Sequence, residues 1–165
     1  MVETFPTFFK QWFVFLEVLI AGKVETTTNF FGIGLGGNND VYGDGNPSIG
    51  LAVNGRLRMS AAVNGEKDYR VIEILPLWTW HKILFSQFKQ LDGSYQYTVR
   101  VNDVILQQVI NTDPREFHNM TAYASGNFNN DPAPVRIDNL IMTTSSTFNI
   151  WISNIVDFSE SRVAS

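Results

Sequence analysis

The sequence predicts an all-β domain, an antiparallel two-sheet β-sandwich, and three observations support that prediction. Apolar and polar residues alternate with a period of two along most of the chain, as in strands with one buried face. Turn dipeptides such as Asn54-Gly55 and Asn64-Gly65 separate the alternating runs. No stretch of a dozen residues carries the 3.6-residue period of an amphipathic helix. Short strands with turns every roughly 8–12 residues are typical of a sandwich.

The first expected strand covers residues 12–20, where Trp12 and every second residue after it are apolar. The apolar run up to Gly22 superficially resembles a signal peptide. However, Pro6 precedes it, Glu17 interrupts it, and no basic leader stands before it. It is also too short for a transmembrane helix. We therefore interpret it as a core strand and expect no insertion into a membrane.

The later strands follow from the same alternation, with Tyr95, Tyr97 and Val99 on one face of a strand as the clearest case. We expect an alternating run on residues 135–141, with Ile137, Asn139 and Ile141 on one face. The complete set of expected strands is 12–20, 26–35, 48–53, 57–63, 69–75, 80–88, 95–101, 104–111, 119–125 and 134–144.

The chain fits one domain of 165 residues. We place the sandwich in residues 1–145. A last apolar alternation, from Phe148 to Phe158, predicts that residues 146–165 form a C-terminal strand or tail extension of the same domain. This segment would cover a sheet edge, either its own or that of a partner in a homo- or hetero-oligomer, because an exposed apolar strand favours aggregation.

Composition excludes several classes of partner. The formal net charge is −4, and the twelve Lys and Arg residues are scattered rather than clustered, so we expect no nucleic-acid binding. The chain has no cysteine, which excludes disulfides and thiolate metal sites. Hydrophobic residues make up 44% of the chain and charged residues only 17%, which indicates a folded domain with a large core.

A resemblance to one known group of domains limits the choice among β-sandwich folds. Leu77-Trp78-Thr79-Trp80-His81-Lys82-Ile83, followed by Tyr95 to Asp103, resembles the central hairpin of laminin-G-like domains. Arg136 to Ile141 resembles a late core strand of the same domains. They belong to the concanavalin A-like lectin/glucanase jelly-roll group. The chain is also similar to extracellular members of this group from marine invertebrates, in the segments Gly36-Gly37-Asn38-Asn39, Tyr42-Gly43-Asp44, Ala62-Val63-Asn64-Gly65 and Arg115-Glu116-Phe117. The resemblance implies a jelly roll and an extracellular protein that binds carbohydrate or a protein partner.

The same group includes glycoside hydrolases, which carry the pattern E-x-D-x-x-E on one strand. Here Glu66 and Asp68 match its beginning, but Val71 stands where the second Glu is required. A retaining mechanism needs both carboxyl groups. The sequence therefore predicts a protein that is not an enzyme. We also expect Glu66 to lie in a turn and His81 to lie at the surface.

The loop over residues 36–47 is the most informative candidate site. Its carboxylates, amides and free carbonyls suit Ca²⁺ or sugar hydroxyls, although the same residue types are common in ordinary turns. If each strand crosses the sandwich once, this loop lies at the same end as loops 64–68, 89–94 and 112–118. The similar loop 126–133 then lies at the opposite end. The candidate ligand-binding residues are Asn38, Asn39, Asp40, Tyr42, Asp44 and Asp68, and the candidate calcium ligands are Asp40 and Asp44.

Two functions remain open. The first is a secreted, non-enzymatic recognition module that binds carbohydrate or an extracellular protein through these rim loops. The alternative is a structural protein that assembles with other chains in a matrix or filament. We interpret Trp78 and Trp80 as packing residues rather than as a sugar platform, because aromatic side chains dominate cores of this class. The glycosylation sequon at Asn119 is interpreted as a chance match.

Overall fold

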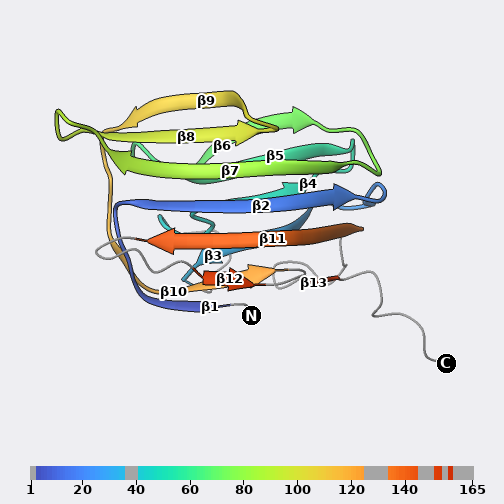
Figure 1. The fold of residues 1–165 in the computed structure, drawn as a ribbon, viewed down its shortest axis with the longest axis horizontal. Coiled ribbons are helices and arrows are strands. Elements are labelled where there is room, and N and C mark those ends of the chain that lie inside the picture. The colour runs from blue at the N-terminus through green and yellow to red at the C-terminus, as the bar shows by residue number, and fades with distance from the viewer. Residues whose placement is uncertain (1–2, 36–40, 125–133, 145–150, 154–155, 158–165) are drawn as a thin grey trace.

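The computed structural model covers residues 1–165 and describes residues 3–35, 41–124, 134–144, 151–153 and 156–157. Every regular element in the described residues is a β-strand, and these strands form two antiparallel sheets packed face to face (Figure 1). Within the same residues there is no helix long and apolar enough to cross a membrane.

The first sheet, called sheet A, has six strands. Their order is β1 (Glu3–Phe8), β10 (Phe117–Ala124), β3 (Thr28–Gly34), β4 (Ser48–Leu51), β5 (Arg56–Val63) and β6 (Glu66–Ile74). Strands far apart in sequence are neighbours here, since β10 lies between β1 and β3. This order carries the chain repeatedly from one sheet to the other.

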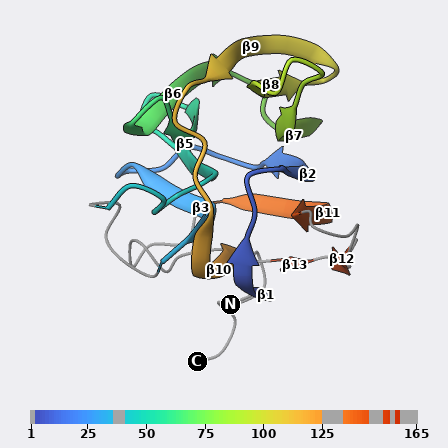
Figure 2. The same ribbon diagram turned by 90° about the vertical axis from the view of Figure 1, so that its left-hand side faces the viewer.

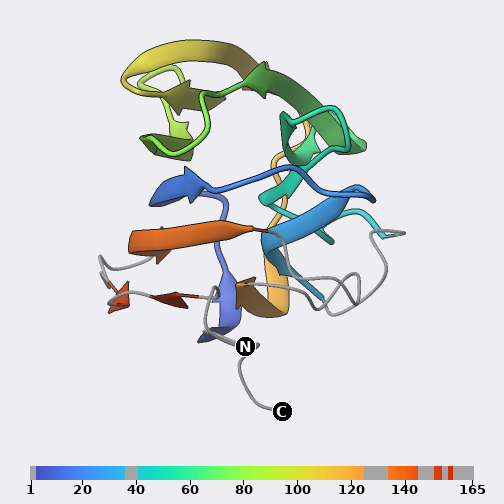
Figure 3. The same cartoon turned by 90° about the vertical axis from the view of Figure 1, so that its right-hand side faces the viewer.

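The second sheet, called sheet B, has seven strands. Their order is β12 (Trp151–Ser153), β11 (Val135–Thr144), β2 (Trp12–Ile20), β7 (Trp80–Lys89), β8 (Tyr95–Val101) and β9 (Val104–Asn111), with β13 (Val156–Asp157) also pairing with β11. The end-on views show the two layers and the edge strands β6 and β9 near each other (Figures 2 and 3).

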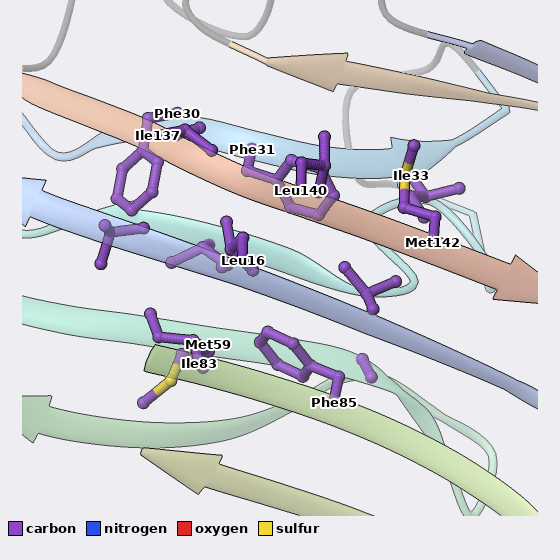
Figure 4. Close-up of a cluster of buried hydrophobic side chains, with 14 of the residues drawn as sticks. Leu16, Phe30, Phe31, Ile33, Met59, Ile83, Phe85, Ile137, Leu140 and Met142 are labelled. Atoms are coloured by element: carbon purple, nitrogen blue, oxygen red, sulfur yellow. The ribbon is translucent and has the colours of Figure 1, made fainter. Parts of the chain in front are cut away.

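The strict alternation of buried and half-buried side chains along β2 determines which of them face the core. In β2 every second side chain from Trp12 to Ile20 is buried, while the intervening side chains are only half-buried. Figure 4 shows Leu16 from this strand among side chains from both sheets, including Phe31, Phe85 and Leu140. Burial of these large apolar groups supplies the main stabilisation of the sandwich.

Four local expectations are corrected. Residues 3–8 form an additional strand, β1, which Pro6 concealed in the sequence pattern because proline is tolerated only at sheet edges. Glu66 begins β6 rather than lying in a turn. A β-bulge between Asp138 and Ile141 shifts the register, so Leu140 and Met142 enter the core instead of Asn139 and Ile141.

His81 is the fourth correction. Its side chain is buried because it alternates onto the inner face of β7, opposite Val18. One ring nitrogen lies 2.9 Å from the carbonyl oxygen of Pro76, and the other lies 3.1 Å from the side-chain amide of Asn102. The two hydrogen bonds satisfy the ring without solvent.

Candidate functional site

One end of the sandwich gathers several connections that the strand count predicts to lie together. The turn at Asn64 is bonded to the β9–β10 connection, because the backbone N–H of Thr112 donates a 2.6 Å hydrogen bond to Oδ1 of Asn64. The hydroxyl of Tyr42 donates a 3.1 Å hydrogen bond to the carbonyl of Asp113. Figure 1 places the β7–β8 turn at this same end, and Figure 2 views it from outside. We call it the rim end.

Asp44 anchors the rim end from within. It is 4% exposed, and its Oδ1 accepts a 2.7 Å hydrogen bond from the backbone N–H of Leu35. Asn46, equally buried, accepts a 3.2 Å hydrogen bond from the N–H of Ala62. These two side chains tie residues 41–47 to Leu35, directly after β3, and to β5. Aspartate and asparagine suit this task because their short side chains bond nearby backbone groups.

The exposed surface of the rim end centres on three side chains. Nε of Arg115 lies 3.1 and 3.0 Å from the two carboxylate oxygens of Asp113, and Nη2 lies 2.5 Å from Oδ2. The guanidinium carbon of Arg115 lies 4.2 Å from the centre of the Tyr42 ring. The ring of Tyr42 also lies beside the ring of Phe117, with 6.0 Å between the two ring centres. We call Tyr42, Asp113 and Arg115 the rim cluster.

The three side chains of the rim cluster shift one another's pKa values. The hydrogen bonds from Arg115 lower the pKa of Asp113, and the same bonds raise the pKa of Arg115. Burial, followed by the nearby Asp113 carboxylate, raises the pKa of Tyr42. At neutral pH the cluster therefore presents an ion pair and a protonated phenol, which together offer both donors and acceptors to a polar ligand.

The structure places the predicted site residues in different parts of the molecule. Asn38, Asn39 and Asp40 lie outside the described residues. Tyr42 lies in the rim cluster, and Asp44 supports the loop from a buried position. Asp68 is exposed on β6, where it pairs with Arg70, and no contact joins it to Tyr42 or Asp44 within the described parts of the chain. In those parts, no group of three His, Asp or Glu side chains is arranged to hold a metal ion.

The strand count placed Asp113 at this end, in the 112–118 loop, but sequence reasoning missed Arg115 as a site residue. The signal for Arg115 was weak, because Thr112 to Glu116 has only the polar composition of an ordinary connection. It also misjudged Trp78 and Trp80, which are 70% and 45% exposed and lie outside the core. The aromatic composition of the class favoured a core position, but both lie where the chain leaves sheet A and enters sheet B.

The geometry of β6 bears on hydrolysis. Glu73 pairs with Leu57 on the inner face of sheet A, and its Oε1 accepts a 2.9 Å hydrogen bond from the N–H of Ile74. Asp68 is five residues away and points outward beside Arg70. Residues an odd number apart on a strand face opposite sides. Asp68 and Glu73 therefore cannot act together as acid and nucleophile on one sugar.

Comparisons with known proteins identify the fold and no closer relationship. No protein-family profile and no curated protein matches the sequence. The native heptameric SAP-like pentraxin of Limulus polyphemus is similar in structure, with a TM-score of 0.55 and 10% identity over 92% of this chain and 83% of the pentraxin.

Two further solved structures are similar. The sialidase of Trypanosoma rangeli, solved with sialic acid, has a TM-score of 0.52 and 13% identity; 80% of this chain matches only 20% of the sialidase. Domain 4 of AbnA, a GH43 extracellular arabinanase from Geobacillus stearothermophilus solved with arabinotriose, has a TM-score of 0.49 and 19% identity over 90% of this chain and 63% of that one. Together with the two antiparallel sheets, the pentraxin match shows that this chain has the concanavalin A-like jelly-roll fold.

Proposed function

We propose that this protein is a non-enzymatic, extracellular recognition module that binds carbohydrate at the rim end. The single observation that carries the proposal is the rim cluster, in which Arg115 lies over the ring of Tyr42 and is held there by Asp113. An ordered charged pair beside an aromatic ring offers fixed donors and acceptors to sugar hydroxyls. Fixing these groups before binding reduces the entropy lost on association.

The surrounding chain adds to this proposal. Asn38, Asn39 and Asp40 are close in sequence to Tyr42 and add amides and a carboxylate. Asp68 lies on β6, whose first residue follows the turn at the rim end. A calcium ion held by Asp40 and Asp44 is part of the same proposal, with carboxylate oxygen as its preferred ligand.

The proposal is tested on a glycan array and by isothermal titration calorimetry of every glycan that binds, with calcium and with a chelator. Replacing Arg115 by Gln keeps a polar side chain but removes the charge, and is expected to weaken binding. Arg100→Gln is the matched control, because Arg100 is an exposed arginine on the outer face of sheet B. Asp40→Asn tests calcium; Asp44 is unsuitable, because its loss leaves the N–H of Leu35 without its partner.

Two results would contradict the proposal. The first is the absence of any glycan that binds, and the second is equal weakening by Arg115→Gln and Arg100→Gln. If the chelator weakens glycan binding by the wild type but does not change binding by Asp40→Asn, the result supports a calcium ion at the rim end.

Assembly is the second candidate, and one observation favours it. The edge strands β6 and β9 expose Ile72, Ile74, Val104 and Ile105. Unpaired strand edges with apolar side chains are surfaces on which another chain can pair. The pentraxin of this fold is a heptamer. An assembling protein would form large species at modest concentration in size-exclusion chromatography with light scattering and would bind no glycan on the array.

A further inference from the structure

Trp78 has an unusual backbone at the end of the sandwich opposite the rim. Its φ is +60°, in the left-handed region that bulky side chains rarely adopt. Its indole is 70% exposed, so burial of the ring does not compensate for this conformation. A conformation of this kind persists only when the surrounding structure imposes it. Glycine would fill the position without strain.

The surrounding hydrogen bonds impose the conformation. The N–H of Trp78 donates a 2.8 Å hydrogen bond to the carbonyl of Ile20, at the end of β2. Two residues earlier, the carbonyl of Pro76 is bonded to the buried ring of His81. Asn102, in the β8–β9 turn, bonds both the His81 ring and the N–H of Lys82. The end of β2 and, through His81, the β8–β9 turn thus hold the loop that carries Trp78, at the end of the sandwich that faces the viewer in Figure 3.

Polar side chains lie beside the second exposed indole. Trp80 pairs with Leu19 on the outer face of sheet B, and Lys82 follows two residues later on the same face. Lys82 pairs with Glu17 across the strands. The β-bulge in β11 brings in an amide, since Asn139, with φ +48°, donates a 2.7 Å hydrogen bond from Nδ2 to Glu17. Bulges re-aim side chains in this way beside binding sites.

From this arrangement we infer a second ligand site, in which Trp78 and Trp80 stack on the rings of a neutral oligosaccharide and Lys82, Glu17 and Asn139 bond its hydroxyls. A sugar ring has an apolar C–H face and a polar edge, which matches exposed indoles next to an amine, a carboxylate and an amide. A flat protein interface would instead favour continuous apolar area at its centre. This site is independent of the rim cluster and survives the failure of the rim proposal.

The test uses the whole chain labelled with ¹⁵N in its four tryptophans, so that each indole N–H gives a resolvable NMR signal. The probes are soluble neutral hexaoses of glucose, mannose, xylose, galactose and arabinose. We expect at least one of them to shift the signals of Trp78 and Trp80. The dissociation constant is expected to rise about tenfold in Trp78→Gly, the loss typical of one aromatic contact, and less in Trp78→Phe.

Stability separates a ligand platform from a structural tryptophan. Because glycine tolerates φ +60°, Trp78→Gly is expected to keep the wild-type melting temperature or raise it while losing binding. Leu91→Ala, an exposed apolar residue in the β7–β8 turn at the rim end, is the control for both measurements. It is expected to change neither.

Four results would overturn the inference. The first is that no hexaose shifts an indole signal. The second is that Trp78→Gly binds as tightly as the wild type, and the third is that Trp78→Gly melts at a lower temperature than the wild type. In the fourth, the Trp78 signal shifts with protein concentration alone, which assigns the surface to a second copy of the chain. Arg115→Gln distinguishes the two sites, because it is expected to leave the indole shifts intact whether or not a glycan binds at the rim.

Discussion

The side-chain amide of Asn111 donates a 2.6 Å hydrogen bond to Oε1 of Gln87, and both side chains are buried. Oδ1 of Asn111 accepts hydrogen bonds from the backbone N–H groups of Asn64, at 2.9 Å, and Asp113, at 3.0 Å. Nε2 of Gln87 donates to the carbonyl of Lys10 at 2.7 Å. This pair therefore joins connections from both sheets and holds the backbone of Asp113, one member of the rim cluster.

Replacing Asn111 by Ala is expected to lower the free energy of unfolding by about 3 kcal/mol, because it leaves a buried amide oxygen and two backbone N–H groups without partners. Urea denaturation measures the change. Gln108→Ala is the control: Gln108 lies on the same strand but bonds Gln96 at the surface, so its loss is expected to cost under about 0.5 kcal/mol. Equal losses for both variants would show that the buried pair does not organise the rim.

The Asp113–Arg115 pair predicts a pH dependence. Hydrogen bonds from Arg115 hold the pKa of Asp113 below its usual 3.8. A carboxyl whose folded pKa is depressed stabilises the fold above its unfolded pKa, and that contribution is lost as pH falls through the folded pKa. Arg115→Gln is expected to raise the pKa of Asp113, measured by ¹³C NMR of the carboxyl group.

Asp92 is the internal reference for this titration. Its pKa is lowered by hydrogen bonds from Ser94 instead, first from the hydroxyl and then from the backbone N–H. Arg115→Gln is therefore expected to leave the pKa of Asp92 unchanged. A parallel rise at both carboxyls would point to a general loss of structure rather than to the loss of one ion pair.

Much of the fold could be predicted from the sequence, because the period of two is a direct consequence of the pleat. The strand expected at 12–20 coincides with β2, and the strands expected at 95–101 and 104–111 coincide with β8 and β9. Errors arise where local geometry overrides the pattern. The extra residue in β11 reverses, after Asp138, which alternate side chains point into the core. The alternation of apolar and polar residues does not predict where such a bulge lies.

The candidate site was less predictable, because a loop residue's role depends on contacts far away in sequence. Asp44 was chosen for its carboxylate, and no local pattern shows that Oδ1 of that carboxylate accepts a hydrogen bond from the N–H of Leu35. Arg115 gains its position from Tyr42, 73 residues earlier in the chain. Trp78 shows the opposite case, since only its backbone conformation and exposure distinguish it from a core tryptophan.

Gly43 is expected to be irreplaceable at the rim. Its φ is +104°, and a Cβ at this position would overlap the ring of Phe117. Gly43→Ala is expected to cost about 3 kcal/mol, whereas Gly55→Ala, with φ +77° and no heavy atom within 4 Å, should cost about 1 kcal/mol. Adding Phe117→Ala to Gly43→Ala removes the overlap, so the two losses should combine to less than their sum. Additive losses would show that the contact with Phe117 is unimportant.

The C-terminal segment supplies the last prediction. Strands β12 and β13 pair antiparallel with β11, along the edge of sheet B. Deleting residues 146–165 removes both and leaves one side of β11 without a partner. Because an unpaired edge can bind the edge of another chain, the truncated protein is expected to be less soluble or to form larger species in size-exclusion chromatography with light scattering. Deleting only residues 158–165 keeps both strands and serves as the control. If the longer deletion leaves size, solubility and unfolding midpoint unchanged, residues 146–165 are a linker and not part of the sandwich.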